Sequence, residues 1–215
     1  MLKMKTILKT LIGFSLLFVL SFAFISNASA AELLTQEKKE LYYQEYLKIA
    51  EELRGNSNLD FNVDKPENFN ENDWVEPEKF KENLETLING GINFVVEEKK
   101  VKLGEISIFA ASPTPTKYVN AYSNSGTFLG QIVVNATVST KWDAGIQGQV
   151  ISGISGVNSY TMQGLSHWSQ SSATGSKVSA QSWNLKLVGT FTTGGVQFPQ
   201  AFTINYKTNS SGTIS

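Results

Sequence analysis

The fold is decided by Thr127–Trp142, which reads TFLGQIVVNATVSTKW. Apolar residues and glycine recur at every second position, and polar residues fill most of the positions between them. The apolar face carries Phe128, Gly130, Ile132, Val134, Ala136, Val138 and Trp142, and the polar face carries Gln131, Asn135, Thr137, Ser139 and Lys141. A period of two with β-branched and aromatic residues on the apolar side predicts a half-buried antiparallel strand.

Similar alternation continues to the C-terminus between short turns that contain glycine or asparagine. The predicted strands are Tyr118–Ser123, Thr127–Trp142, Ile146–Ile154, Tyr160–Ser169, Lys177–Phe191 and Val196–Lys207. Sequential strands with short turns predict that residues 118–215 form an antiparallel β-sandwich or a partly closed barrel. On the same pattern Trp142, Trp168 and Trp183 are expected to face the core, because packing is the usual role of a strand tryptophan.

Residues 31–109 have a different, helical character. Apolar residues recur at helical spacing from Glu32 to Arg54, and a second helix is expected from Pro77 to Gly90, where Pro77 suits a first helical position. The polar segment 56–75 between them is expected to be a loop. Two short strands, 92–96 and 101–109, are expected to form a hairpin, and the prolines of residues 110–117 predict a linker.

The first thirty residues have the layout of a secretory signal peptide. Lysines at positions 3, 5 and 9 precede an apolar run, and Ala28-Ser29-Ala30 supplies a small-residue cleavage site. The chain contains no cysteine, so neither a lipid-anchored thiol nor a disulfide framework is available to the exported protein. These features predict a protein secreted to the extracellular space, in the manner of a Gram-positive bacterium.

Charge is divided unevenly along the chain. Residues 31–105 contain eighteen acidic and ten basic residues, whereas after residue 105 Asp143 is the only acid beside five lysines. A solvated helical segment beside a Ser/Thr-rich sheet explains this division. The alternative is that residues 31–111 are an acidic pro-segment covering a cationic β-domain.

Few residues of the sequence are suited to catalysis. His167 is the only histidine, so a Ser/His/Asp site would need His167 with Asp143, and the alternation places His167 on the outer face of its strand. One carboxylate in the β-domain is too few for the pair that glycoside hydrolysis uses, and one histidine is too few for a typical zinc site. Phosphate-binding glycine motifs and a strongly basic composition are both missing. The sequence therefore favours a protein that is not an enzyme and does not bind nucleic acid.

A calcium site is the one metal-binding hypothesis that the sequence offers. Oxygen-bearing side chains follow the spacing of an EF-hand loop at Asp60, Asn62, Asp64, Asn68 and Glu71. Lys65 stands where that loop needs glycine, and Pro66 restricts Lys65 further. No cofactor other than calcium is expected.

Two functions follow from these observations. The first is a secreted non-enzymatic protein whose β-domain binds an extracellular or cell-envelope partner. The alternative is a processed antibacterial or membrane-active protein, because strands with one apolar and one polar face also occur in the amphipathic hairpins of pore-forming proteins. Under this alternative alone the membrane is a partner.

Overall fold

The structure is a computed structural model and describes residues 34–57, 59–97 and 115–215. The chain divides into two compact units, residues 1–36 and residues 37–215. The predicted signal peptide lies outside the described residues. The fold described below is that of the second unit.

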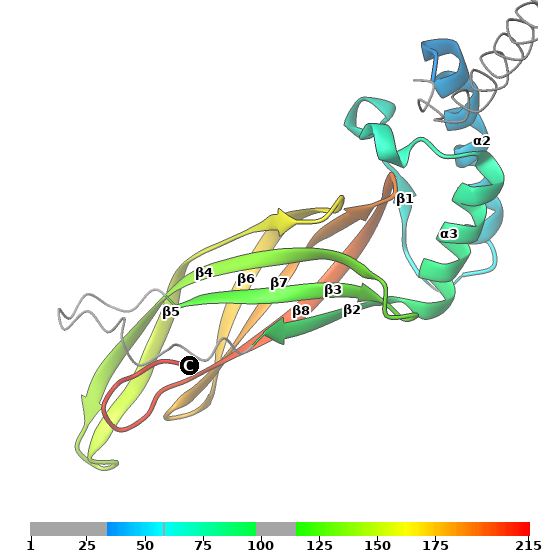
Figure 1. Cartoon of the computed structure of the whole chain (residues 1–215). Coiled ribbons are helices and arrows are strands. Elements are labelled where there is room, and N and C mark those ends of the chain that lie inside the picture. The colour runs from blue at the N-terminus through cyan, green and yellow to red at the C-terminus, as the bar shows by residue number, and fades with distance from the viewer. Residues whose placement is uncertain (1–33, 58, 98–114) are drawn as a thin grey trace, which may run out of the picture. The chain divides into compact units, whose positions relative to one another are not determined.

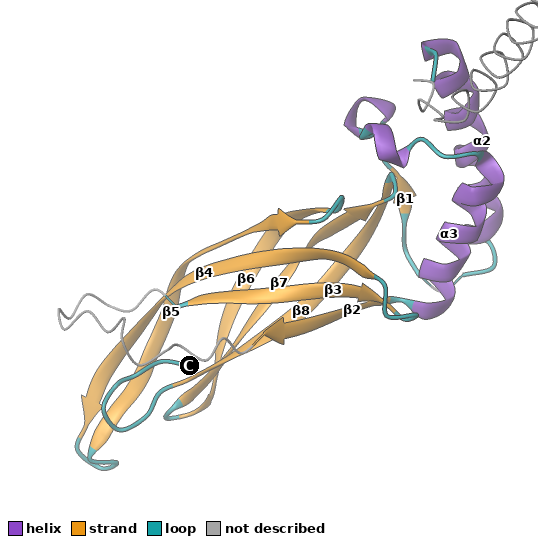
Figure 2. Cartoon of the chain, viewed as in Figure 1, coloured by secondary structure: helices purple, strands orange, loops and turns teal. Residues whose placement is uncertain are grey.

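Two antiparallel sheets of four strands each dominate this unit, and Figure 2 shows them in orange. The strands are β1 (Asn62–Val63), β2 (Ile92–Glu97), β3 (Thr116–Ser123), β4 (Phe128–Asp143), β5 (Gly148–Gln163), β6 (His167–Ser179), β7 (Ser182–Thr193) and β8 (Val196–Lys207). Their order is β1-β8-β7-β6 in one sheet and β2-β3-β4-β5 in the other. The predicted mainly β fold, an antiparallel sandwich preceded by a small helical region, is confirmed.

The core lies between the two sheets. Alternate residues of β4, including Ile132, Val134 and Val138, meet Leu185 of β7 and Ile204 of β8, and all five are almost fully buried. The apolar face predicted for β4 is therefore the inner face of its sheet. Burial of such side chains contributes on the order of 1.5–3 kcal/mol each, so a chain without disulfides is stabilised mainly by this layer.

The three strand tryptophans have different environments. Trp168 is 2% exposed in the core and Trp183 packs against the core, as predicted. The prediction for Trp142 was wrong, since its side chain is 62% exposed. The ladder with β3 reaches only Asn135 of β4, and a register shift follows Ser139. Among the described residues, Trp142 therefore lies where β4 pairs with β5 alone, beyond the part of the sheet that β3 covers (Figure 1).

Residues 156–158 and 174–176, which separate the predicted strands, lie inside β5 and β6. Gly156 has φ +58° and lies where the β4–β5 register shifts, so it accommodates a bulge without ending the strand. Gly175 lies under the ring of Trp183, where a Cβ would stand 3.6 Å from the ring. The turn that joins β5 to β6 instead begins at Gly164, whose φ is +99°. These three glycines mark a bulge, a close contact with a ring and a turn, respectively. Because the sequence does not distinguish these roles, the predicted ends of the strands differ from those in the structure.

The described residues contain two α-helices: α2 (Gln36–Arg54), which precedes β1, and α3 (Pro77–Gly90), which lies between β1 and β2 in the chain. The predicted amphipathic stripe of α2 is confirmed, with Tyr42, Tyr46 and Ala50 buried. Tyr46 stacks on Phe80 of α3 with ring centroids 4.0 Å apart. This stacking joins the two helices in one small aromatic core. Helix α3 begins at Pro77 as predicted.

The segment between the helices is more than the loop that was predicted. Phe61 is fully buried, with its ring centroid 6.1 Å from that of Phe198 in β8, and β1 adds an edge strand to β8. The sequence does not predict these contacts, because Phe61 lies between Asp60 and Asn62 in a polar stretch. Farther along, β2 pairs with β3 over six positions. Residues 101–109, the predicted partner of β2, lie outside the described residues, and the proposed domain boundary stays a prediction.

Tyr206 has an unusual environment, because its side chain is fully buried and its hydroxyl has no hydrogen-bond partner among the described residues. An unpaired buried hydroxyl costs about 1–3 kcal/mol. We therefore expect Tyr206→Phe to raise the free energy of unfolding by about 1 kcal/mol, measured by urea denaturation at neutral pH. The matched control is Tyr46→Phe. The Tyr46 hydroxyl donates to the carbonyl of Val75 and accepts from its N–H, so that variant loses about 1–3 kcal/mol.

Alkaline unfolding gives a second measurement on the same variants. Burial raises the pKa of Tyr206 to about 12 from the ordinary 10.0, so the folded protein holds this proton more tightly than the unfolded chain. Stability is therefore expected to fall as pH rises from about 10 to about 12. Tyr206→Phe makes that fall shallower. A loss of stability in Tyr206→Phe at neutral pH would show that the hydroxyl is satisfied.

Candidate functional site

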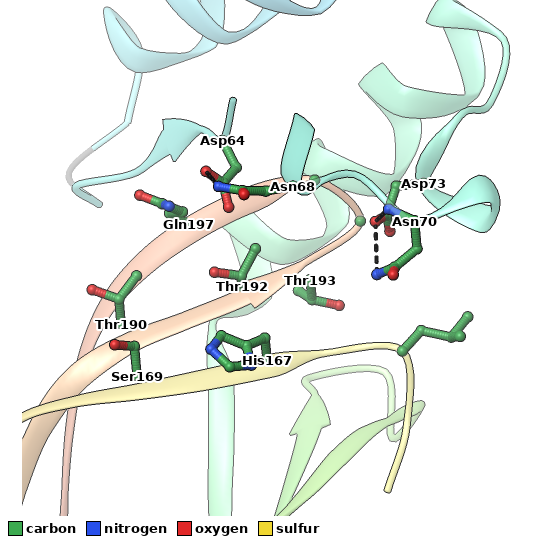
Figure 3. A pocket seen from close by; sticks show the side chains of 13 residues that line it. Asp64, Asn68, Asn70, Asp73, His167, Ser169, Thr190, Thr192, Thr193 and Gln197 are labelled. Carbon is green, nitrogen blue, oxygen red and sulfur yellow. Dashed lines mark hydrogen bonds between the residues drawn. The ribbon is translucent and has the colours of Figure 1, made fainter. Parts of the chain in front are cut away.

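A polar pocket of about 520 Å³ lies beside the β7–β8 turn. One wall is the segment 64–73, and the other is the outer face of the sheet that contains β6, β7 and β8. Figure 3 shows the side chains of the two walls around a common space. Its lining residues are Asp64, Asn68, Asn70, Asp73, Leu165, His167, Ser169, Thr190, Thr192, Thr193, Gly194, Gly195 and Gln197.

The loop wall is fixed to the sheet by backbone contacts. Val63 of β1 pairs with Val196 of β8, and the Asp64 N–H donates to the carbonyl of Gly195 at 2.9 Å. Gly195 has φ +72°, and a Cβ there would lie 2.4 Å from the ring of Phe69. Only glycine suits both the backbone conformation and the close approach of the ring. These contacts hold the segment 64–73 over the end of the sheet.

Two aspartates organise the loop wall through local hydrogen bonds. Asp64 Oδ1 accepts from the Lys65 N–H at 2.7 Å and from Asn68 Nδ2 at 2.9 Å. Asp73 Oδ2 accepts from the backbone N–H of Asn70 at 2.8 Å and from its Nδ2 at 3.3 Å. The first of these two bonds, together with a bond from the Asp73 N–H to the Asn70 side chain, forms the capping box around the 3-10 helix Glu71–Asp73. Both carboxylates are thereby held in one orientation, which pre-organises the wall.

The sheet wall consists of cross-strand neighbours on one outer face. His167 of β6 pairs with Thr192 of β7, and Thr192 in turn pairs with Gln197 of β8. Ser169 and Thr190 form the next row. Because side chains alternate across a strand, the burial of Trp168 places His167 and Ser169 on the outer surface. The outward position predicted for His167 is confirmed, since it is exposed and its neighbour is buried.

The pocket is rich in acceptors and contains no lysine or arginine among its lining residues. Asp73 is 7% exposed, and burial raises the pKa of its carboxyl above the ordinary value, while the hydrogen bonds from Asn70 oppose the shift. The charge of Asp64 raises it further. A ligand that brings hydroxyl or ammonium hydrogens is suited to this lining, because those groups donate to carboxylate and amide oxygens.

The structure places the predicted calcium ligands on different elements. Asn62 lies in β1 and its Oδ1 accepts from Arg54, Asp64 and Asn68 bond to each other, and Glu71 pairs with Lys39 at 2.7 Å. Asp60 is exposed in the loop that precedes β1. In the described part of the chain no group of three or more His, Asp or Glu residues could hold a metal ion. Calcium binding by these five residues stays a prediction.

The two residues that a Ser/His/Asp site would need lie far apart. Asp143 ends β4 at its turn into β5, and β5 runs sixteen residues back before His167 begins β6. That path spans on the order of 50 Å along the strand. The Asp143 carboxylate is instead used by its own turn, where Oδ1 accepts from the N–H groups of Gly145 and Ile146.

Most of the pocket was not foreseen from the sequence. The sequence predicts Asp64 and Asn68 as calcium ligands and His167 as a surface residue, but it does not point to Asn70, Asp73, Thr192 or Gln197 as site residues. The spacing Asn70–Asp73 is a capping-box pattern, which was the one readable signal. The meeting of the loop with β8 is a long-range contact that no local pattern encodes.

Comparison of the chain with protein-family models, with curated proteins and with solved structures found no match. None of the helices among the described residues is both long and apolar enough to span a membrane. The chemistry of the pocket and of the surface is therefore the basis for any functional inference.

We expect Asp73→Asn to raise stability at neutral pH. The amide oxygen of the variant still accepts from Asn70, whereas the cost of burying a charge is removed. Because the folded-state pKa of Asp73 is raised above 3.8, its contribution is most favourable at acid pH and is lost as pH rises through the carboxyl range. The free energies of unfolding of wild type and variant, measured in urea, should therefore agree near pH 3. Toward pH 7 they should diverge, with the variant more stable.

Glu67→Gln is the matched control, because Glu67 is an exposed carboxylate on the same loop. Its stability is expected to follow that of the wild type at every pH. A variant Asp73→Asn that is less stable at neutral pH would mean that the hydrogen bonds from Asn70 to the carboxylate outweigh its burial.

Proposed function

We propose that this protein is a secreted, non-enzymatic binding protein whose β-sandwich holds an extracellular or cell-envelope ligand in the polar pocket. The observation that carries the proposal is the pocket itself, a space of about 520 Å³ lined by hydroxyl, amide and carboxylate side chains on rigidly paired elements. Sites assembled on strands of a scaffold hold their side chains more exactly than sites on loops alone. The fitting ligand class is a polyhydroxylated unit, such as a sugar of an envelope polymer.

The polarity of the pocket supports this ligand class. Small-molecule sites are usually lined by apolar and aromatic side chains with a few polar groups, whereas here Leu165 is the only large apolar side chain in the lining. A hydrated ligand with many hydroxyls exchanges water for Thr, Ser, Asn, Gln and carboxylate partners at little net cost. A nucleic acid is disfavoured, because phosphates need basic partners and the lining has no lysine or arginine.

The non-enzymatic part of the proposal rests on the arrangement of titratable groups. Those in the pocket are His167, Asp64 and Asp73, and both aspartates are held by hydrogen bonds to neighbouring asparagines or backbone N–H groups. No hydrogen bond joins His167 to a serine or to a carboxylate within the described residues. A nucleophile paired with its base is the usual mark of a hydrolytic site.

A cell-wall sedimentation assay tests the proposal. The wild-type protein is expected to sediment with purified cell walls and to be released by soluble wall glycan fragments. Thr192→Val deletes the hydroxyl in the middle of the sheet wall and keeps the β-branched shape, so we expect about three- to tenfold weaker binding. Thr203→Val is the matched control, since Thr203 is an exposed outer-face residue of β8 that does not line the pocket. Wild-type protein that stays in the supernatant, or equal binding by Thr192→Val, would refute the pocket as the binding site.

The alternative, in which an acidic pro-segment is removed from a membrane-active β-domain, leads to a different expectation. Residues before the linker supply β1 and β2 to the two sheets. Phe94 of β2 stacks on Phe202 at 4.9 Å and meets Phe191 edge-on at 5.7 Å between ring centroids. Loss of this segment would uncover that aromatic cluster and remove the loop wall of the pocket.

We therefore expect a chain cut at a protease site inserted between residues 98 and 114 to remain one particle. The two pieces should co-elute in gel filtration and separate only in denaturant, because β1–β8 and β2–β3 pairing persists after the cut. A folded β-domain that elutes alone, free of residues 31–97, would favour the pro-segment alternative.

A further inference from the structure

The free end of the β4–β5 hairpin exposes large apolar side chains. Trp142 is 62% exposed and Ile146 is 46% exposed, and only four residues separate β4 from β5 here. We call residues 141–147 the hairpin tip. Single exposed apolar residues are common on proteins, but a tryptophan and an isoleucine on one tight turn form a protruding apolar spot. Figure 1 shows this hairpin continuing past the ends of β2 and β3.

The conformation of the hairpin tip is fixed by its own hydrogen bonds. Asp143 Oδ1 accepts from the Gly145 N–H at 2.9 Å and from the Ile146 N–H at 3.2 Å. The base of the hairpin is also braced, since the Gln149 N–H donates to the carbonyl of Ser210. Ile146 and Trp142 are therefore presented without a large ordering cost on binding, which favours docking.

Lysines gather at the same end of the sandwich. Lys141 belongs to the hairpin tip, and Lys177 lies at the end of β6, next to the turn whose Ala180 carbonyl accepts from the Ile151 N–H of β5. Lys207 ends β8 and pairs across the ladder with the first residue of β7. All three are exposed. Asp143 is the only acidic side chain in residues 116–215, and its carboxylate is occupied by the turn.

We propose that the hairpin tip docks the protein on an anionic lipid surface. Trp142 and Ile146 enter the boundary between headgroups and acyl chains, where tryptophan is favoured. Lys141, Lys177 and Lys207 lie against the anionic headgroups, each adding attraction that salt weakens. A soluble polyanion would satisfy the lysines but offers no apolar phase to Trp142 and Ile146, so the combination selects a lipid surface.

This surface is separate from the pocket. The hairpin tip is at the end where β4 meets β5, whereas His167 and Thr192 mark the end where β6 begins and β7 finishes. Docking therefore leaves the pocket open, and the inference does not depend on the proposed ligand.

Vesicle co-sedimentation of the full chain tests the inference. The wild type is expected to sediment with vesicles of equal parts phosphatidylglycerol and phosphatidylcholine, and to bind pure phosphatidylcholine at least tenfold more weakly, because three lysines contribute to binding. Trp142→Ser with Ile146→Ser is expected to lower the partition coefficient at least tenfold on the mixed vesicles. Lys141→Gln with Lys177→Gln is expected to lower it about tenfold on the mixed vesicles and to leave binding to phosphatidylcholine unchanged.

Every variant carries the same residues 1–30, and two matched controls change exposed residues away from the hairpin tip. Met162→Ser removes an equally exposed apolar side chain of β5, 57% exposed, at the other end of the strand, and Lys79→Gln removes an exposed lysine of α3. Both controls are expected to bind like the wild type, and thermal unfolding checks that all variants are folded. Equal binding by the tip variants and the wild type would overturn the inference. So would wild-type binding to a soluble polyanion without binding to vesicles.

Discussion

The indole of Trp168 is the contact on which both the sandwich and the pocket depend. Its Nε1 donates to Ser159 Oγ at 2.8 Å, and its backbone N–H donates to Thr161 Oγ1 at 2.7 Å. Both partners lie on β5, in the other sheet, so these bonds close the seam between β5 and β6. The ring also packs 5.2 Å from that of Phe202. A buried indole whose N–H donates a hydrogen bond contributes apolar area to the core, and the hydrogen bond fixes the orientation of the ring.

This burial has a direct consequence for the surface. With Trp168 turned inward, the strand period turns His167 and Ser169 outward, beside Thr192 and Thr190 of β7. Gly189 makes room for the ring, since a Cβ there would lie 2.7 Å from the indole. Packing inside the sandwich and the chemistry of its outer face are thus two results of one strand register.

The polar segment 64–73 completes the pocket through a few anchors. Phe61 packs on Phe198, and Phe69 packs on Gly195. Beside these anchors the asparagines and aspartates organise one another, since Asn68 donates to Asp64 and Asn70 donates to Asp73. The raised pKa of Asp73 shows the cost of this arrangement, since burial disfavours its charged form. Residues kept at a cost in stability are common where a surface has a binding role.

Local sequence patterns predicted which helices and strands form. They predicted less well where each element ends and which elements contact one another. The inward face of β4 followed from alternation, and the stripe of α2 followed from helical spacing. Trp142 and Trp168 both lie on apparent core faces in the sequence, yet one is exposed and the other buried. Their difference depends on how far the neighbouring strands extend, which alternation cannot express. Phe61 was overlooked for a similar reason, because its partner lies in β8 and its own neighbours are polar.

The sequence by itself determined a helical acidic part and an antiparallel β-part nearly free of carboxylates, and it predicted a secretory signal peptide. Those properties are additive over residues and can be counted or read from a period. Tertiary structure alone decided that β1 and β2 complete the sheets, that two aspartates of the helical part face threonines of the β-part, and that Trp142 is exposed on a free hairpin. Each of these features depends on contacts between residues that are distant in the sequence. Such contacts close long loops of chain, and the entropy that this costs is offset only by the complete fold.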